Sequence, residues 1–300
     1  MLHGLLIIDK GIGWTSHDVV AKLRRITGVR RIGHAGTLDP FATGVLPVAV
    51  GKATRLLQYV TAEDKHYLTV VALGTETDSG DLTGRPIGDA YGGPWPTREQ
   101  VEAVLPEFRG EIEQIPPAFS AIKVDGERLY RLARAGTDVV VPPRRVTIHD
   151  LRLLAYDPPY LHLHVHCGKG TYVRALARDI GQRLGCFGYC HALRRTAVGS
   201  FCVGDAWTLD ELANQDVAAN WPRIALHPDA GLRGVPAVIL GEADAVKWYH
   251  GRLIRPTFTH WQGEELARVY NYQGAFIGLG IPDPDGALRP QLVFATEGEG

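Results

Sequence analysis

The sequence predicts an α+β fold, in which helices flank a mixed, largely antiparallel sheet and a small β-rich unit follows. Short apolar runs rich in β-branched residues alternate with amphipathic segments that begin at capping residues. This alternation lacks the strand-helix-strand rhythm of a parallel sheet. A chain of 300 residues suits two domains of unequal size. Because the character of the sequence changes near Asn220, we expect one domain over 1–220 and a second over 221–300.

The expected elements follow from local patterns, taken in chain order. Strands are expected where short apolar runs stand, at 5–9, 45–50, 66–75, 146–156 and 161–167. Helices are expected to begin at capping residues, and these starts are Ser16, Thr97, Thr171 and Thr208. Gly28 and Gly185 are expected to end the first and third of these helices, since glycine readily adopts the left-handed conformation that terminates a helix. One further helix is expected near 242–250, within the β-rich unit.

The composition indicates a globular protein of a reducing compartment. Hydrophobic residues make up 45% of the chain and charged residues 22%. No apolar run approaches the ~20 residues that span a bilayer, and the N-terminus lacks the basic start and long apolar core of a signal peptide. Only four cysteines are present, which favours free thiols over a disulfide framework. We therefore expect a cytoplasmic protein without membrane contact.

The net charge of −1 conceals an uneven distribution of charge. Three segments, 10–31, 123–152 and 169–195, carry 19 of the 32 Lys and Arg residues but only 6 of the 33 acidic residues. If these segments share a face, that face attracts polyanions such as nucleic acid. A solvated helix surface is the alternative explanation.

Two patterns concern bound groups. The triplet at 51–53, GKA, resembles the end of a phosphate-binding loop, but alanine stands where Ser or Thr must reach magnesium, so no nucleotide cofactor is expected. Three histidines alternate along one expected strand and would point to one face, as zinc ligands or as a polar strand face. The candidate ligands are His162, His164 and His166, with Cys186, Cys190 and His191 as further candidates. No Asp or Glu lies within four residues of the three histidines, so we expect no metal and keep a zinc hydrolase as an alternative.

The segment 33–47, GHAGTLDPFATGVLP, is the most informative stretch of the chain. Its glycines allow the backbone to approach a ligand closely. Asp39 precedes Pro40, and taken locally an Asp-Pro pair is most often a turn cap. Local pattern alone therefore leaves a functional and a structural explanation open for Asp39.

This segment resembles the signature of the TruB family of bacterial tRNA pseudouridine-55 synthases. Five further motifs of that family occur in the same order between residues 5 and 201. They are LIIDKGIGWTSHDV at 6–19, KHY at 65–67 with LGTETD at 73–78, PPAFSAIK at 116–123, KGTYVR at 169–174 and LRR at 193–195. Several independent matches in order are far more specific than one pattern. The resemblance implies a pseudouridine synthase catalytic domain followed by a PUA-like domain.

The resemblance implies that three residues take part in the reaction. Asp39 corresponds to the nucleophilic aspartate, Arg174 to its partner, and Tyr67 to the residue that stacks on the target uracil. Burial alone would raise the pKa of a carboxyl group, and an adjacent guanidinium offsets that rise. Arginine suits this role because it stays charged and binds a carboxylate through two donors.

Three more positions correspond to residues near the target nucleotide. His34 would lie where the nucleotide leaves its stack, Leu193 would form a wall of the base pocket, and Lys10 would lie close by as structural support. The chain departs from the family pattern at two places, where Gly11 replaces a proline and Gly168 replaces a serine. Neither glycine is assigned to catalysis.

The segment 115–145 corresponds to an insertion with which the family grips RNA. A short helix is expected within it, over 123–134, with cations at helical spacing that suit phosphate contacts. These cations are Lys123, Arg128, Arg131 and Arg134. Residues 221–300 hold seven basic and nine acidic side chains, which argues against a large share for the C-terminal unit in binding RNA.

The implied function is isomerisation of a T-loop uridine of tRNA to pseudouridine, by a monomer without a cofactor. The reaction involves no redox step and no energy input, in agreement with the missing nucleotide-binding loop. A tRNA-binding protein without turnover, on the same fold, is the competing interpretation. Asp39, Tyr67 and Arg174 together disfavour it, since a protein that only binds RNA does not need that carboxylate.

Overall fold

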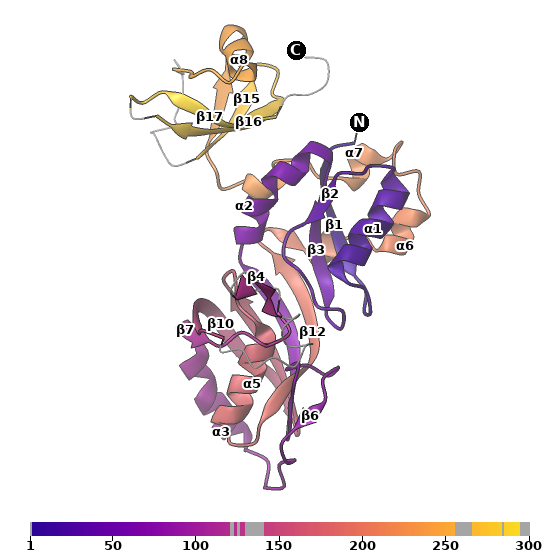
Figure 1. Ribbon diagram of the computed structural model, residues 1–300, viewed down its shortest axis with the longest axis vertical. Helices are drawn as coiled ribbons and strands as arrows, with labels where there is room; N and C mark the ends of the chain where they lie inside the picture. Colours follow the sequence, from indigo (N-terminus) through magenta and orange to yellow (C-terminus); the bar gives the residue numbers. More distant parts are fainter. Residues whose placement is uncertain are drawn as a thin grey trace.

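A computed structural model describes residues 2–120, 123–124, 127–129, 141–255, 266–283 and 285–294. Figure 1 shows an elongated molecule, with a small C-terminal unit at one end and a larger body that contains the main sheet. Among the described residues, no helix combines the length and apolar character needed to cross a membrane.

The body is built on a nine-stranded sheet. Seven strands follow one another across it in the order β1 (Gly4–Lys10), β3 (Thr43–Val50), β12 (Gly188–Val198), β4 (Lys65–Leu73), β11 (Tyr160–Cys167), β10 (Arg144–Asp157) and β7 (Gly110–Gln114). Two short strands lie off this order, β2 (Ile32–His34) paired with β3 and β13 (Phe201–Cys202) paired with β12. Among the described pairings of this nine-stranded sheet, only that of β3 with β12 is parallel. The predicted mixed, largely antiparallel sheet is confirmed.

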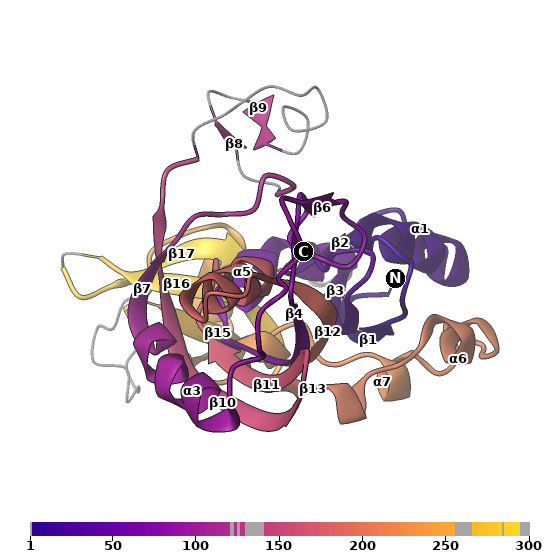
Figure 2. The ribbon, with the colours of Figure 1, turned by 90° about the horizontal axis from the view of Figure 1, so that it is seen from below.

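Helices and short strands surround this sheet. The α-helices of the body are α1 (Ser16–Thr27), α2 (Leu57–Ala62), α3 (Arg98–Val104), α5 (Val173–Arg183), α6 (Leu209–Ala213) and α7 (Trp221–Ile224). The 3-10 turns are η1 (Gly51–Leu56), η2 (Leu105–Phe108), η3 (Val203–Asp205) and η4 (Ala230–Leu232), and a separate pair of strands is β5 (Glu76–Thr77) with β6 (Pro86–Ile87). Figure 2 shows α3 and α5 together on one side of the sheet. Apolar residues of α5 join the inward side chains of β4 and β11 in the largest core cluster.

The helix ends correct two sequence predictions by one or two residues. Thr15, not Ser16, caps α1, because its side chain accepts a bond from the backbone N–H of Asp18. Helix α5 begins at Val173 after Tyr172, whereas the Thr171 hydroxyl donates to the carbonyl of Gly168. The capping boxes at 97–100 and 208–211 and the left-handed glycine at 28 are confirmed.

The insertion differs from its prediction where the structure describes it. Lys123 pairs with Arg128 across two short antiparallel strands, β8 (Lys123–Val124) and β9 (Glu127–Arg128). The expected helix is therefore wrong over these residues, because the chain reverses direction within six positions. Figure 2 shows this pair standing out from the body. Arg131 and Arg134 lie outside the described residues.

The C-terminal unit is a four-stranded sheet packed against one helix. Its strand order is β14 (Ala237–Leu240), β15 (Ala267–Asn271), β16 (Phe276–Pro282) and β17 (Leu288–Val293), and α8 (Glu242–Tyr249) buries Trp248 against it. Residues after 220 still contact the body, since Leu226 bridges Leu5 and Ile224 lies in the main core. These contacts favour a boundary after Leu226 and before β14.

Candidate active site

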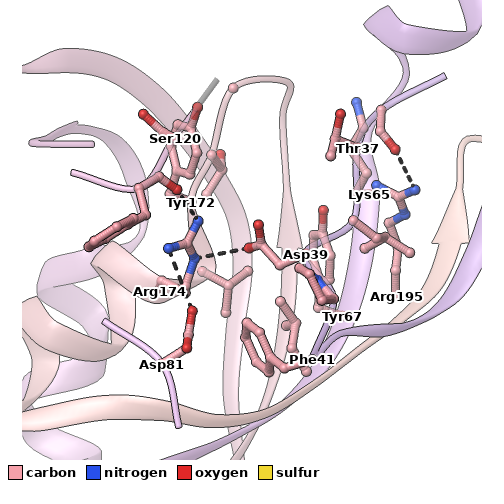
Figure 3. Close-up of a pocket in the computed structure, with 18 of the residues that line it drawn as sticks. Thr37, Asp39, Phe41, Lys65, Tyr67, Asp81, Ser120, Tyr172, Arg174 and Arg195 are labelled. Atoms are coloured by element: carbon pink, nitrogen blue, oxygen red, sulfur yellow. Dashed lines mark hydrogen bonds and ion pairs between the residues drawn. The ribbon is translucent and has the colours of Figure 1, made fainter. Parts of the chain in front are cut away.

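The candidate site is an open cavity of about 1470 Å³ beside the centre of the main sheet. Its lining comes from the loop after β2, the start of β4, the turn after β5, the N-terminal end of α5 and the middle of β12. Figure 3 shows Asp39, Tyr67 and Arg174 lying around one space, although 135 positions separate the first from the last in the chain. The structure thus brings together the three residues that the family motifs singled out.

The loop that carries Asp39 is held by buried polar contacts. The Ser16 hydroxyl accepts from the backbone N–H of Leu38 at 2.9 Å and donates to its carbonyl. Lys10 is fully buried, and its ammonium donates to the carbonyls of Trp14, at 2.7 Å, and Pro40, at 3.5 Å. Burial lowers the pKa of Lys10 to about 8, against the opposing charge of Asp39. Lys10 therefore supports the loop from behind and does not line the cavity.

Arg195, which the sequence interpretation left without a role, ties the same loop to β3 and β12. Its side chain is 1% exposed and donates to the carbonyls of Val45, at 2.7 Å, and Gly36, at 2.9 Å. Gly44 has φ +104°, and a Cβ there would lie 2.1 Å from the carbonyl oxygen of Arg195. The parallel pairing of β3 with β12 therefore requires glycine at this position of the motif.

Arg174 is the central cation of the site. Its Nε lies 2.9 Å from a carboxylate oxygen of Asp39, and its Nη1 lies 3.6 Å from one of Asp81. The guanidinium also donates to the carbonyls of Ser79, at 2.7 Å, and Phe119, at 2.9 Å. Figure 3 shows it between the two carboxylates. The side chain of Arg174 is 4% exposed, and these four partners hold its guanidinium in this orientation.

The carboxyl group of Asp39 is subject to opposing influences. Burial raises its pKa above the ordinary value, the Arg174 guanidinium lowers it, and the charge of Asp81 raises it, with a raised pKa as the outcome. About a third of the side chain, 35%, remains exposed to the cavity. An approaching ligand can therefore reach a carboxylate that Arg174 holds in place.

Asp81 is a second residue that the sequence interpretation missed. It is 4% exposed, and its carboxylate accepts from Ser79 and from the backbone N–H of Thr83, both at 2.9 Å. The available signal was a second aspartate three positions after the family's Thr-Asp pair, in a turn of the form DSGD. Nothing local to that turn indicates that it faces Arg174.

Tyr67 and Leu193 line the cavity from neighbouring strands. Tyr67 lies on β4 opposite Arg195 of β12, and its ring is 7% exposed. Burial raises the pKa of its hydroxyl, and the charge of Arg195 opposes this rise. Leu193 is 9% exposed and adds an apolar side chain to the lining. Tyr172, from the motif before α5, also lines the cavity.

His34 lies behind His17 and does not line the cavity itself. Its ring meets that of His17 edge to face at 5.5 Å between centroids, and His17 lines the cavity directly. Burial lowers the pKa of His34, as do the charges of His17 and Arg195. Its buried Nδ1 finds no hydrogen-bond partner among the described residues.

The two departures from the family pattern lie where side chains would fit. A Cβ on Gly11 would meet only Trp14, at 3.8 Å. A Cβ on Gly168 would lie 3.7 Å from Thr147 and 3.8 Å from Asp64, which are ordinary contacts. Neither glycine is therefore required by its backbone or by crowding.

The cavity rim carries cations. Lys169 and Arg85 are exposed and line the opening, whereas Lys65 is buried and donates to the carbonyl of Thr61 at 2.8 Å. Exposed cations at the mouth of a cavity attract anionic groups. The side chains of Lys123, Arg128, Arg131 and Arg134 lie outside what the structure describes, so their gripping role stays a prediction.

Models of known protein families match most of the chain. A family model described as TruB family pseudouridylate synthase, N-terminal domain, matches residues 24–173. Models of the tRNA pseudouridylate synthase B C-terminal domain and of the pseudouridine synthase II TruB C-terminus match 174–227 and 236–294.

Two curated relatives span nearly the whole chain. A protein named tRNA pseudouridine synthase B from Parasynechococcus marenigrum is 44% identical over 299 residues, covering 98% of each chain. One of the same name from Pseudomonas putida is 40% identical and covers 99% of this chain and 97% of its own. Among solved structures, a Cbf5-Nop10-Gar1 complex matches with a TM-score of 0.75 at 25% identity, over 97% of this chain and 85% of that one.

Proposed function

The chain belongs to the TruB family of pseudouridylate synthases, and we propose that it isomerises a uridine in the T-loop of tRNA to pseudouridine, as a monomer. The observation that carries this proposal is the ion pair of Asp39 and Arg174 at 2.9 Å, beside an open cavity of about 1470 Å³. This volume exceeds the ~300–1,000 Å³ of pockets for drug-sized ligands and admits a nucleotide with its flanking backbone.

The chemistry of the reaction matches a site with one reacting carboxylate. The bond between uracil N1 and C1′ breaks, the base turns, and C5 joins C1′ while a proton leaves C5 and N1 gains one. Atoms and electrons balance without an oxidant or a nucleotide. Asp39 acts on the nucleoside as nucleophile or base, and either role needs its ionised form. Arg174 favours that form and aims the carboxylate into the cavity.

The target base has to leave its stack to reach Asp39. Extrusion costs a few kcal/mol, and stacking on an aromatic ring returns ~1–3 kcal/mol. Tyr67 supplies such a ring next to the carboxylate, and Leu193 supplies an apolar wall. His17 and His34 form the aromatic pair beside the opening, where the neighbouring bases of the loop would pass.

Recognition of the T-loop rests on shape and backbone contacts, as is usual for structured RNA. The exposed Lys169 and Arg85 at the rim lie where phosphates would flank the extruded nucleotide. The insertion adds the cations of its two strands and of the segment beyond them.

The test uses tRNA transcripts that carry 5-tritiated uridine. We expect one equivalent of tritium to be released per tRNA, and the pseudouridine to map to the T-loop. A transcript with cytidine at that position should release none, as the matched control. Tight tRNA binding without tritium release would make the protein a binding protein. Release from a site outside the T-loop would refute the substrate assignment alone.

A further inference from the structure

A cluster of histidines occupies the face of the sheet opposite the cavity. Along β11 the apolar residues point into the core, while His162, His164 and His166 alternate with them on the outer face, as the sequence predicts. His66 of β4 stands directly opposite His166, and their rings stack at 4.0 Å between centroids and 11° between planes. His149 of β10 approaches His166 from the other side, at 4.7 Å.

A carboxylate completes this cluster from outside the strands that carry the histidines. Asp64 immediately precedes β4, and one of its oxygens lies 3.2 Å from His149 Nε2 and 3.6 Å from His166 Nε2. The three potential ligand atoms all lie within 4.8 Å of one another. Among the described residues this group, and not the set of His162, His164 and His166, is close enough to share one ion.

We propose that Asp64, His149 and His166 bind one divalent transition-metal ion, with zinc as the probe that defines the site. In a tetrahedral zinc site with bonds of ~2.0–2.1 Å, neighbouring ligand atoms lie about 3.3 Å apart. The Asp64 oxygen lies 3.2 Å from His149 Nε2 and 3.6 Å from His166 Nε2, which is close to this separation without an ion to draw the ligands together. Two imidazoles and one carboxylate suit zinc and its neighbours, whereas magnesium and calcium prefer oxygen ligands alone.

The surroundings hold these ligands in place. The stacked His66 restricts rotation of the His166 ring, and His166 is paired in register on β11. His149 lies at an irregularity of β10 between Ile148 and Asp150, beside the position that pairs with His166. Three protein ligands leave a fourth position for water on this half-exposed surface. The side chain of Asp64 is 47% exposed, and its second oxygen, Oδ1, lies beside Gly168, where a Cβ would be 3.8 Å away.

The site would join three strands next to the cavity without touching it. Asp64 adjoins Lys65, a cavity residue, but none of the three ligands lines the cavity. An ion bound there would cross-link the residue before β4, the strand that carries Tyr67, to β10 and β11. Its consequence is therefore stability of the sheet, and the inference does not depend on the proposed reaction.

The test is titration of metal-stripped protein with zinc chloride against a chromophoric chelator. We expect one ion per chain, and a loss of affinity in His149→Ala, His166→Ala and Asp64→Asn that exceeds the roughly 10–100-fold cost of losing an outer partner. His162→Ala is the matched control, on the same strand and face, and should bind as the wild type does. Cobalt(II) should give the intense visible absorption of a tetrahedral site in the wild type and in this control.

Three results would overturn the proposal. They are equal affinity in Asp64→Asn and the wild type, equal losses in His162→Ala and His149→Ala, and a stoichiometry of one ion per two chains. Circular dichroism and melting without zinc show whether each variant is folded, and zinc should raise the melting temperature of the wild type and of His162→Ala only.

Discussion

Replacement of Arg174 by Met is expected to destabilise the body of the protein and to slow the chemical step. The guanidinium is 4% exposed and neutralises Asp81, whose side chain is 6% exposed. Removing one partner of a buried ion pair costs about 3–5 kcal/mol, because the other charge stays buried without compensation. Asp39 moderates the loss, since its side chain is 35% exposed and water can solvate it. We therefore expect Arg174→Met to lower the free energy of unfolding by about 3 kcal/mol, the lower end of this range.

The assay is urea unfolding followed by circular dichroism, with Arg183→Met as the matched control. Arg183 lies on the same helix and donates two 2.7 Å bonds to Glu107, but both side chains are about half exposed. Its loss should leave the unfolding midpoint almost unchanged, because exposed ion pairs contribute little. A loss below about 1 kcal/mol for Arg174→Met, the range of a surface pair, would refute the view that Arg174 organises the site.

Three further predictions concern pH, metal and RNA. Asp39 reacts when ionised, so the single-turnover rate should fall as the pH drops through the pKa of Asp39, which lies above the ordinary 3.8. Because the guanidinium favours the ionised form, Arg174→Met should move this acidic fall in rate to higher pH, and an unchanged pH profile would contradict the assignment. Exhaustive chelation should leave tritium release unchanged, since none of the three proposed zinc ligands lines the cavity; activity that disappears and returns with zinc would favour a metal-dependent reaction. The triple variant Arg128→Ala, Arg131→Ala and Arg134→Ala should weaken tRNA binding and reduce the slope of log binding constant against log salt concentration by something under ~1 per lost contact. The rate of the chemical step at saturating enzyme should stay nearly unchanged, and full tRNA affinity in this variant would contradict a role of these arginines in gripping RNA.

Much of the local structure could be predicted because it depends on neighbours in sequence. The capping boxes at 97–100 and 208–211 and the helix end at Gly28 need only a few adjacent residues. The cap of α1 is Thr15 and not the expected Ser16, because both residue types are good caps and the helix begins at Ser16 itself. The helix expected over 123–128 is wrong because cations at helical spacing are also compatible with a reversal of the chain.

The remainder depends on contacts between distant residues. Arg195 donates to the carbonyl of Val45, which is 150 positions away in the chain. Asp81 pairs with Arg174, which is 93 positions away. No local pattern indicates either contact. The family motifs marked Asp39, Tyr67 and Arg174, but the reason for Gly44 appears only when β12 lies parallel to β3. In the same way, Asp64 and His149 join His166 only through the order of strands β4, β11 and β10.

The most direct test of the central claim is single-turnover tritium release by Asp39→Asn with enzyme in excess over tRNA. The change is close to isosteric, and Arg174 keeps Asp81 and two carbonyls as partners, so folding and tRNA affinity should stay near wild type. Because the amide can act neither as nucleophile nor as base, we predict no pseudouridine above background. Pseudouridine formed by this variant at a measurable rate would contradict the role of Asp39 as the reacting carboxylate.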